Sequence, residues 1–226
     1  MWGAIGFIAG AVSIGFFAMT ARQAYLTIPF RKLQLLCTAY GLLAGCMLLW
    51  AFAVLNNDWT KLPSVLLASD ALILLATGCM ALTFFEVTSI TLVVAMAISG
   101  GLILGLRATT YQTTAFVQDG LLYFNLEGTI RNILLGVFLI VWLPAMTNLT
   151  RYFSKDAVLA SLKSSLTGAF ALLVIISSFF LAAHRSWVII TLFAAIVVLF
   201  AALGVMNLLV VRLRQPKGAK HAAKHA

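Results

Sequence analysis

The sequence predicts an all-α polytopic membrane protein, folded as a compact bundle of seven transmembrane helices. Of the 226 residues, 63% are hydrophobic and only 9% are charged, and the mean hydropathy is +1.07. Soluble domains carry roughly 25% charged residues. Seven apolar runs follow one another at lengths that suit the roughly 30 Å hydrocarbon core of a bilayer. The polar segments between them are short, so we expect any catalytic or signalling output domain to belong to another chain.

The first three helices are expected near residues 2–20, 33–55 and 64–85. The first run has no basic residue before it and no small-residue cleavage site, so it reads as a spanning helix and not as a signal peptide. Pro29 breaks the chain between the first two runs. The turn NNDWTKLP separates the second run from the third.

A fourth helix is expected near residues 90–106, after a tight turn that begins at Glu86. The longest polar connection follows, and within it Asp119-Gly120 lies between β-prone residues. A two-residue Asp-Gly connection is typical of a β-hairpin. We therefore expect a short hairpin or flap at the membrane face, between the fourth and fifth helices.

The last three helices are expected near residues 129–148, 164–183 and 187–211. Only His184, Arg185 and Ser186 join the sixth run to the seventh, which requires an antiparallel pair. Residues 1–211 then form one transmembrane domain, and residues 212–226 form a basic, flexible cytoplasmic tail.

Charge distribution predicts the orientation of the bundle. With the amino terminus outside, eleven basic residues fall in cytoplasmic segments and four in outer segments. The positive-inside rule favours this orientation in the inner or plasma membrane of the cell, as a multi-pass protein. The cytoplasmic set is Arg22, Arg31, Lys32, Arg151, Lys155, Lys163, Arg212, Arg214, Lys217, Lys220 and Lys224, and the outer set is Lys61, Arg107, Arg131 and Arg185.

Three GxxxG spacings predict close helix packing, because small residues let helix backbones approach each other in lipid. They are Gly6 with Gly10, Gly41 with Gly45, and Gly101 with Gly105. Packing within the bundle is favoured over a seam between two copies, and the oligomeric state stays open.

Asp70 is the acidic residue that lies inside an apolar run. A charged carboxylate at a helix centre is disfavoured by about 2.5–3.5 kcal/mol on insertion scales, so Asp70 should face other helices. Three interpretations stay open: a structural ion pair, a ligand, ion or proton site under the flap, or a neutral hydrogen-bonded acid. The candidate cluster at the outer face comprises Asp70, Arg107, Glu127, Arg131, His184 and Arg185.

Several chemistries are excluded by the residues themselves. An aspartate on the third of seven helices resembles the microbial retinal proteins in topology, but no lysine lies in any apolar run, so retinal cannot be held covalently. Histidines are missing from the apolar runs, which excludes bis-histidine haem. The cysteines lack metal-ligand spacing. We expect no cofactor, no metal and no enzymatic activity.

The basic tail predicts contact with the membrane surface. A polybasic segment beside a spanning helix binds anionic phospholipid headgroups, and we favour this over binding to RNA, so no nucleic acid is expected as a partner. The residues expected to contact anionic lipid are Arg212, Arg214, Lys217, Lys220 and Lys224.

The leading hypothesis is a sensor-like or receptor-like protein, or an accessory subunit, that couples the outer polar site to a membrane or cytoplasmic protein partner. Its layout resembles the seven-helix amino-terminal sensor regions of some bacterial histidine kinases. The alternative is a small transporter or channel with Asp70 in the translocation path. A continuous polar path from Asp70 towards Thr83 or Glu86 would favour transport, and a dry core below Asp70 would favour sensing or structure.

Overall fold

The computed structural model describes residues 2–27, 31–56, 62–84, 94, 97–98, 100–102, 105, 115–118, 120–124, 136, 160–181 and 186–214. Its elements are α1 (Trp2–Thr27), α2 (Arg31–Asn56), α3 (Leu62–Phe84), β1 (Ala115–Gln118), β2 (Leu121–Phe124), α6 (Ala160–Leu181) and α7 (Ser186–Arg214). The described part of the chain is therefore almost entirely helical.

Four of these helices, α1, α2, α3 and α7, are long and apolar enough to cross a membrane. Their apolar runs cover Gly3–Leu26, Arg31–Asn56, Pro63–Thr83 and Ser186–Leu209. Large apolar side chains point outward from them, as at Met19 and at Val198, which is 69% exposed. An apolar surface of this extent suits hydrocarbon and not water. The chain is a helical membrane-spanning protein.

Several helices run further than their apolar segments suggest, and α2 begins at Arg31 and α6 at Ala160, before the expected positions 33 and 164. The first, expected over residues 2–20, continues to Thr27, because Ala21 and Ala24 still bury their side chains while Arg22 and Gln23 between them are exposed. The last helix continues through Arg214, since no helix breaker occurs before Pro216. Arg212 and Arg214 therefore belong to α7.

The fourth and fifth predicted helices fall mostly outside the described residues. Within the expected range 90–106, positions 94, 97–98, 100–102 and 105 are described, and all of them are helical. Within 129–148 the structure describes position 136, which is also helical.

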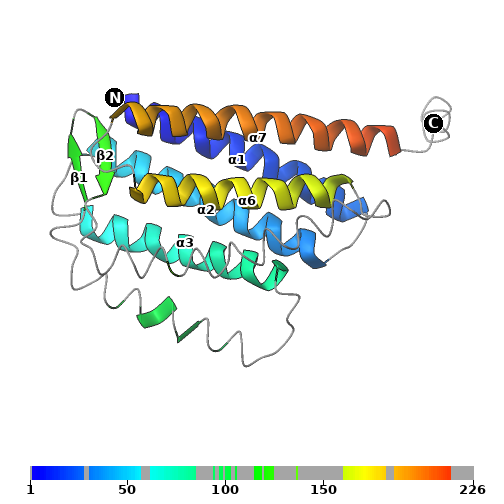
Figure 1. Cartoon of the computed structure of the whole chain (residues 1–226), viewed down its shortest axis with the longest axis horizontal. Helices are drawn as coiled ribbons and strands as arrows, with labels where there is room; N and C mark the ends of the chain where they lie inside the picture. Colours follow the sequence, from blue (N-terminus) through cyan, green and yellow to red (C-terminus); the bar gives the residue numbers. More distant parts are fainter. Residues whose placement is uncertain are drawn as a thin grey trace, which may run out of the picture.

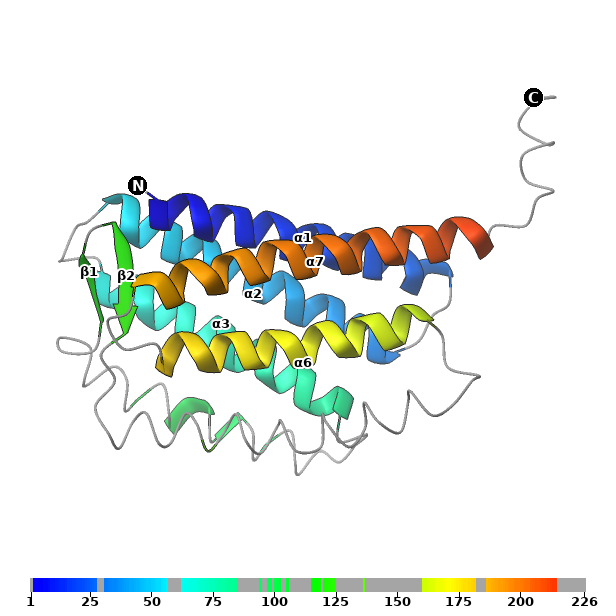
Figure 2. The same cartoon turned by 45° about the horizontal axis from the view of Figure 1, so that its top comes forward.

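The helices lie side by side along the long axis of the molecule (Figure 1). The central helix α2 packs against α1, α3 and α6, and α1 packs against α7. The helices α1, α3 and α7 run away from the hairpin, and α2 and α6 run back towards it (Figures 1 and 2). We call the two ends of the bundle the hairpin end and the far end.

The predicted antiparallel pairing of the last two helices is confirmed. Ser164 of α6 bonds to Asn207 of α7, and one turn further on Gly168 of α6 lies against Leu203 of α7. The residue number rises along one helix as it falls along the other, which only antiparallel neighbours show.

The predicted hairpin is also confirmed. Strands β1 and β2 pair antiparallel with Gln118 opposite Leu121, so residues 119–120 form a two-residue connection. Gly120 has a φ of 73°, a left-handed conformation that glycine adopts without strain. Leu122 and its neighbours on β2 are buried, and β2 contacts α1 and α2. The hairpin thus covers one end of the bundle.

The GxxxG spacings differ in what they face. A Cβ atom at Gly6 would lie 2.6 Å from the Phe193 ring, and one at Gly10 would lie 3.5 Å from Ile196, so this pair packs α1 against α7. At Gly41 and Gly101 a Cβ atom would meet no atom of the described residues within 4 Å. Among the described residues, only the first spacing seats both of its glycines against a neighbouring helix.

Candidate functional site

Asp70 lies on α3, about 12 Å along the helix from Leu62. It is 7% exposed, which confirms that it faces protein and not lipid. It is the one acidic residue among those that the structure describes. Asp70 directly follows Ser69, whose hydroxyl lies at the interface of α2 and α3.

A buried hydrogen bond joins α2 to α3 beside this carboxyl group. The Trp50 indole Nε1–H donates to Ser69 Oγ over 2.9 Å, and the Ser69 hydroxyl donates to the Leu66 carbonyl over 2.7 Å. Trp50 is 1% exposed. Ser69 had no sequence signal beyond its position next to Asp70.

Trp50 also belongs to a group of three rings, which we call the hairpin-side trio. The Phe7 ring of α1 lies edge-on to Trp50, with centroids 5.4 Å apart, and edge-on to Phe193 of α7, with centroids 4.6 Å apart. Edge-to-face packing is the favoured arrangement of aromatic rings. The trio ties α1, α2 and α7 together next to the Asp70 site.

A second group of rings, the far-side trio, repeats this arrangement nearer the far end. Phe17 of α1, Tyr40 of α2 and Phe200 of α7 are the members. Their ring centroids lie 4.9 Å apart for Phe17 and Tyr40, 5.4 Å for Phe17 and Phe200, and 6.0 Å for Tyr40 and Phe200. Aromatic rings of the same three helices therefore pack against one another at two levels of the bundle.

Tyr40 of the far-side trio also forms a hydrogen bond with a further helix, α6. The Tyr40 hydroxyl donates to the Ser165 carbonyl of α6 in a buried hydrogen bond. The Ser164 hydroxyl donates to Asn207 Oδ1 of α7 over 2.5 Å. Asn207 Nδ2 and Ser165 Oγ are buried without a hydrogen-bond partner in the described part of the chain. The junction of α2, α6 and α7 is thus unusually polar for a membrane interior.

No known protein family, curated protein or solved structure matches this chain. The function therefore has to be argued from the arrangement of these side chains.

The remaining members of the predicted outer cluster lie outside the described residues. These are Arg107, Glu127, Arg131, His184 and Arg185. Asp70 does have an interaction partner within the protein. The predicted lipid-contact residues Lys217, Lys220 and Lys224 also lie outside the described residues, and Arg212 and Arg214 occupy the last turn of α7.

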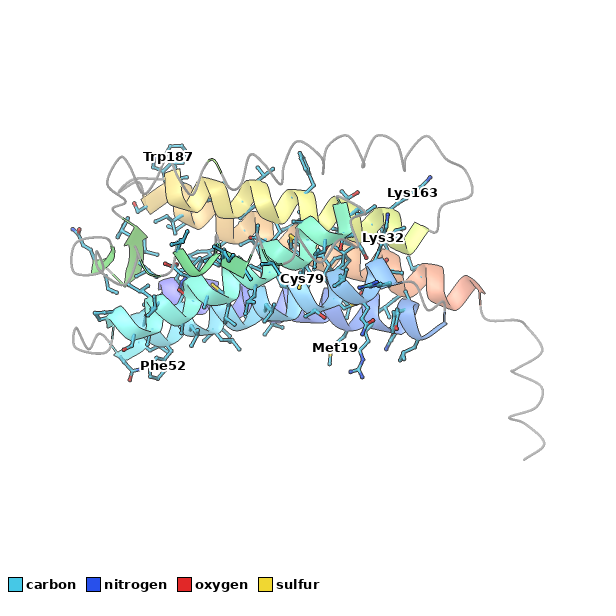
Figure 3. All side chains as sticks on the ribbon, turned by 90° about the horizontal axis from the view of Figure 1, so that it is seen from below. Met19, Lys32, Phe52, Cys79, Lys163 and Trp187 are labelled. Atoms are coloured by element: carbon cyan, nitrogen blue, oxygen red, sulfur yellow. The ribbon has the colours of Figure 1, made fainter. Side chains whose placement is uncertain are left out.

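The described basic residues share one end of the bundle. Arg22, Arg31, Lys32, Lys163, Arg212 and Arg214 all lie in the far-end turns of their helices. Figure 3 shows Lys32 of α2 and Lys163 of α6 at this same end. The described residues at the hairpin end include no basic side chain.

Over the described ranges, no three His, Cys, Asp or Glu side chains come together in a group that could hold a metal ion. Cys37, Cys46 and Cys79 are free thiols. Cys37 lies on α2 one turn from Tyr40, which makes it a natural reporter of the far-side trio.

Proposed function

We propose that the protein is a non-enzymatic seven-helix membrane sensor or accessory subunit, in which α2 couples an outer polar site at Asp70 to the cytoplasmic end of the bundle. The observation that carries this proposal is the double attachment of α2. Trp50 bonds to Ser69 of α3 beside Asp70, and Tyr40 bonds to Ser165 of α6. The two attachments are about 15 Å apart along one helix.

The coupling works through the rigidity of a helix that is held at both levels. A ligand, ion or proton that engages Asp70 changes the surroundings of Ser69 and so the hydrogen bond from Trp50. Because close-packed interiors transmit small displacements, α2 carries the change to Tyr40. Tyr40 then shifts the far end of α6, where a cytoplasmic partner would respond.

The charge distribution supports an outer hairpin end and a cytoplasmic far end. All six described basic residues lie towards the far end, as the positive-inside rule requires of a cytoplasmic face. The same surface suits anionic phospholipid headgroups, to which we also assign the basic tail.

The ends of the described elements support seven crossings. Helix α3 ends at the far end and β1 lies at the hairpin end, while β2 lies at the hairpin end and α6 begins at the far end (Figure 1). One membrane crossing between α3 and β1 and one between β2 and α6, together with the five described helices, give seven crossings. This placement fits helices near 90–106 and 129–148.

The buried face of α3 supports sensing over transport. Below Asp70 this face carries Ile73, Ala76 and Met80, which are buried and apolar, and one buried hydroxyl group, that of Thr77. Thr83, further along, donates its hydroxyl to its own helix at the Cys79 carbonyl. The described face therefore offers little to solvate an ion on its way to the far end.

Coupling can be tested with Cys37 as the reporter, after Cys46 and Cys79 have been replaced by alanine. Trp50→Phe removes the indole N–H and should change the rate of Cys37 labelling by a maleimide several-fold. Trp187→Phe is the matched control, because Trp187 is 64% exposed on α7 and should leave the rate unchanged. Equal rates in both folded variants would refute the coupling.

Transport has its own test in proteoliposomes. If the chain is a sensor, flux of protons, sodium or potassium through vesicles that contain it should equal flux through vesicles with Asp70→Asn. A flux that is present in the natural protein and absent in the variant would establish the transporter or channel instead.

A further inference from the structure

We propose that the β1–β2 hairpin is a lid over the Asp70 site, held shut by a latch between Gly3 and Gly120. This rests on the proposed function, because it concerns how a ligand from the outer side reaches that same site.

The latch is a hydrogen bond between the first turn of α1 and the hairpin turn. The Gly3 N–H donates to the Gly120 carbonyl over 3.2 Å. The N–H groups in the first turn of a helix have no partner within the helix, so Gly3 is free to bond outward. A Cβ atom at Gly3 would lie 2.2 Å from that carbonyl oxygen, so the latch closes only on glycine.

The hairpin is seated by apolar side chains of β2. Leu121, Leu122 and Tyr123 are buried and belong to the same core as Phe7 and Trp50. An isolated two-stranded hairpin is at best marginally stable in water. The closed position therefore depends on these contacts and on the latch, and weakening either should release the hairpin as a unit.

The order of residues from the hairpin inward explains what the lid controls. β2 contacts α1 and α2, the two helices that carry Phe7 and Trp50 of the hairpin-side trio. Trp50 in turn bonds to Ser69, the neighbour of Asp70. A solute that enters between α1 and α2 from the hairpin end would therefore meet β2 before it reaches this group.

Two thiol reporters can test the lid in the full chain. The first is Cys46, which is 1% exposed and lies on α2 one turn before Trp50, with Cys37 and Cys79 replaced by alanine. The second is Leu122→Cys in a background without other cysteines, which reads the seating of the hairpin directly. Each is labelled with N-ethylmaleimide in detergent, with and without Gly3→Ala.

The matched control is Gly15→Ala, on the same helix, where a Cβ atom would lie more than 4 Å from every atom in the described part of the chain. Gly3→Ala should raise the labelling rate of both reporters at least several-fold, and Gly15→Ala should raise neither. If Gly3→Ala does not yield folded protein, Leu122→Ala replaces it with the Cys46 reporter.

Two outcomes would overturn the lid. Labelling that rises at position 122 but not at Cys46 would mean that the hairpin covers the bundle end without guarding the site. Labelling that rises at neither position would mean that the latch does not hold the hairpin. The lid test does not use Cys37 as a reporter. Its result therefore stays valid even if the coupling through α2 fails.

Discussion

Trp50 illustrates how single residues organise this bundle. A buried indole N–H needs an acceptor, and the need is acute in hydrocarbon, where no water can serve. Ser69 supplies that acceptor from α3. Because the ring also packs on Phe7, one side chain joins α1, α2 and α3 beside the buried acid.

Replacing Trp50 by phenylalanine should lower the free energy of unfolding. The lost interhelical hydrogen bond is worth about 1 kcal/mol, and the smaller ring loses packing in addition. The measurement is SDS-induced unfolding in mixed micelles. The exposed Trp187→Phe should stay within about 0.5 kcal/mol of the natural protein. Equal stability of both variants would count against the role assigned to Trp50.

The Asn207 amide makes a second residue-scale prediction, because one of its two polar atoms is already unpaired in the described structure. Ser164→Ala removes the partner of the other atom and should cost about 1–3 kcal/mol. Asn207→Leu removes the whole amide at similar volume and should cost less, or even stabilise. A larger loss from Asn207→Leu in the same unfolding assay would show that the amide has a partner of its own.

At the scale of whole helices, close approach is decided by a few glycines. A Cβ atom at Gly168 of α6 would lie 2.9 Å from the Phe17 ring, 3.1 Å from the Tyr40 hydroxyl and 3.3 Å from Leu203. Three other helices therefore meet α6 at this one residue. Gly41 belongs to a GxxxG spacing and yet faces open space.

Gly168→Ala should therefore destabilise the protein while Gly41→Ala does not. Overpacking a close helix junction costs about 1–3 kcal/mol. An exposed helical glycine costs roughly 0.5–1 kcal/mol relative to alanine in water, so Gly41→Ala should be neutral or stabilising. Thermal unfolding in detergent measures both. If the order were reversed, α6 would not be held as closely as described.

Across the whole molecule, the positions of the basic residues and of the hairpin indicate the same orientation in the membrane. The described basic residues belong to the far-end turns of their helices. The hairpin and the first turn of α1 lie at the other end (Figure 2). Anionic lipid and positive-inside insertion both favour the basic end on the cytoplasmic side.

Orientation can be measured with single cysteines at two exposed positions in a cysteine-free background. Gln118→Cys lies on the hairpin and Gln23→Cys lies near the far end of α1. In intact cells an impermeant maleimide should label position 118 at once and position 23 only after the membrane is permeabilised. The opposite pattern would invert the topology and move the Asp70 site to the cytoplasmic half.

Several features followed from local sequence signals. Apolar runs predicted the spanning helices, Asp119-Gly120 predicted the hairpin, and the cost of a charge in lipid predicted the burial of Asp70. Helix ends were less predictable, because the residues beyond Thr20 remain helical through the burial of two alanines and not through an apolar run. The predicted partners of Asp70, from Arg107 to Arg185, lie outside the described residues and stay predictions.

Composition and short-range pattern by themselves determined that this chain is a membrane protein and where its described helices run, because both properties depend on each segment's own residues. Only the tertiary structure decided which helix faces meet. The bonds from Trp50 to Ser69 and from Tyr40 to Ser165 join residues 19 and 125 positions apart, and their formation depends on how each helix is rotated against the next. In an apolar bundle that rotation is set by packing, to which nearly uniform apolar runs give no sequence marker.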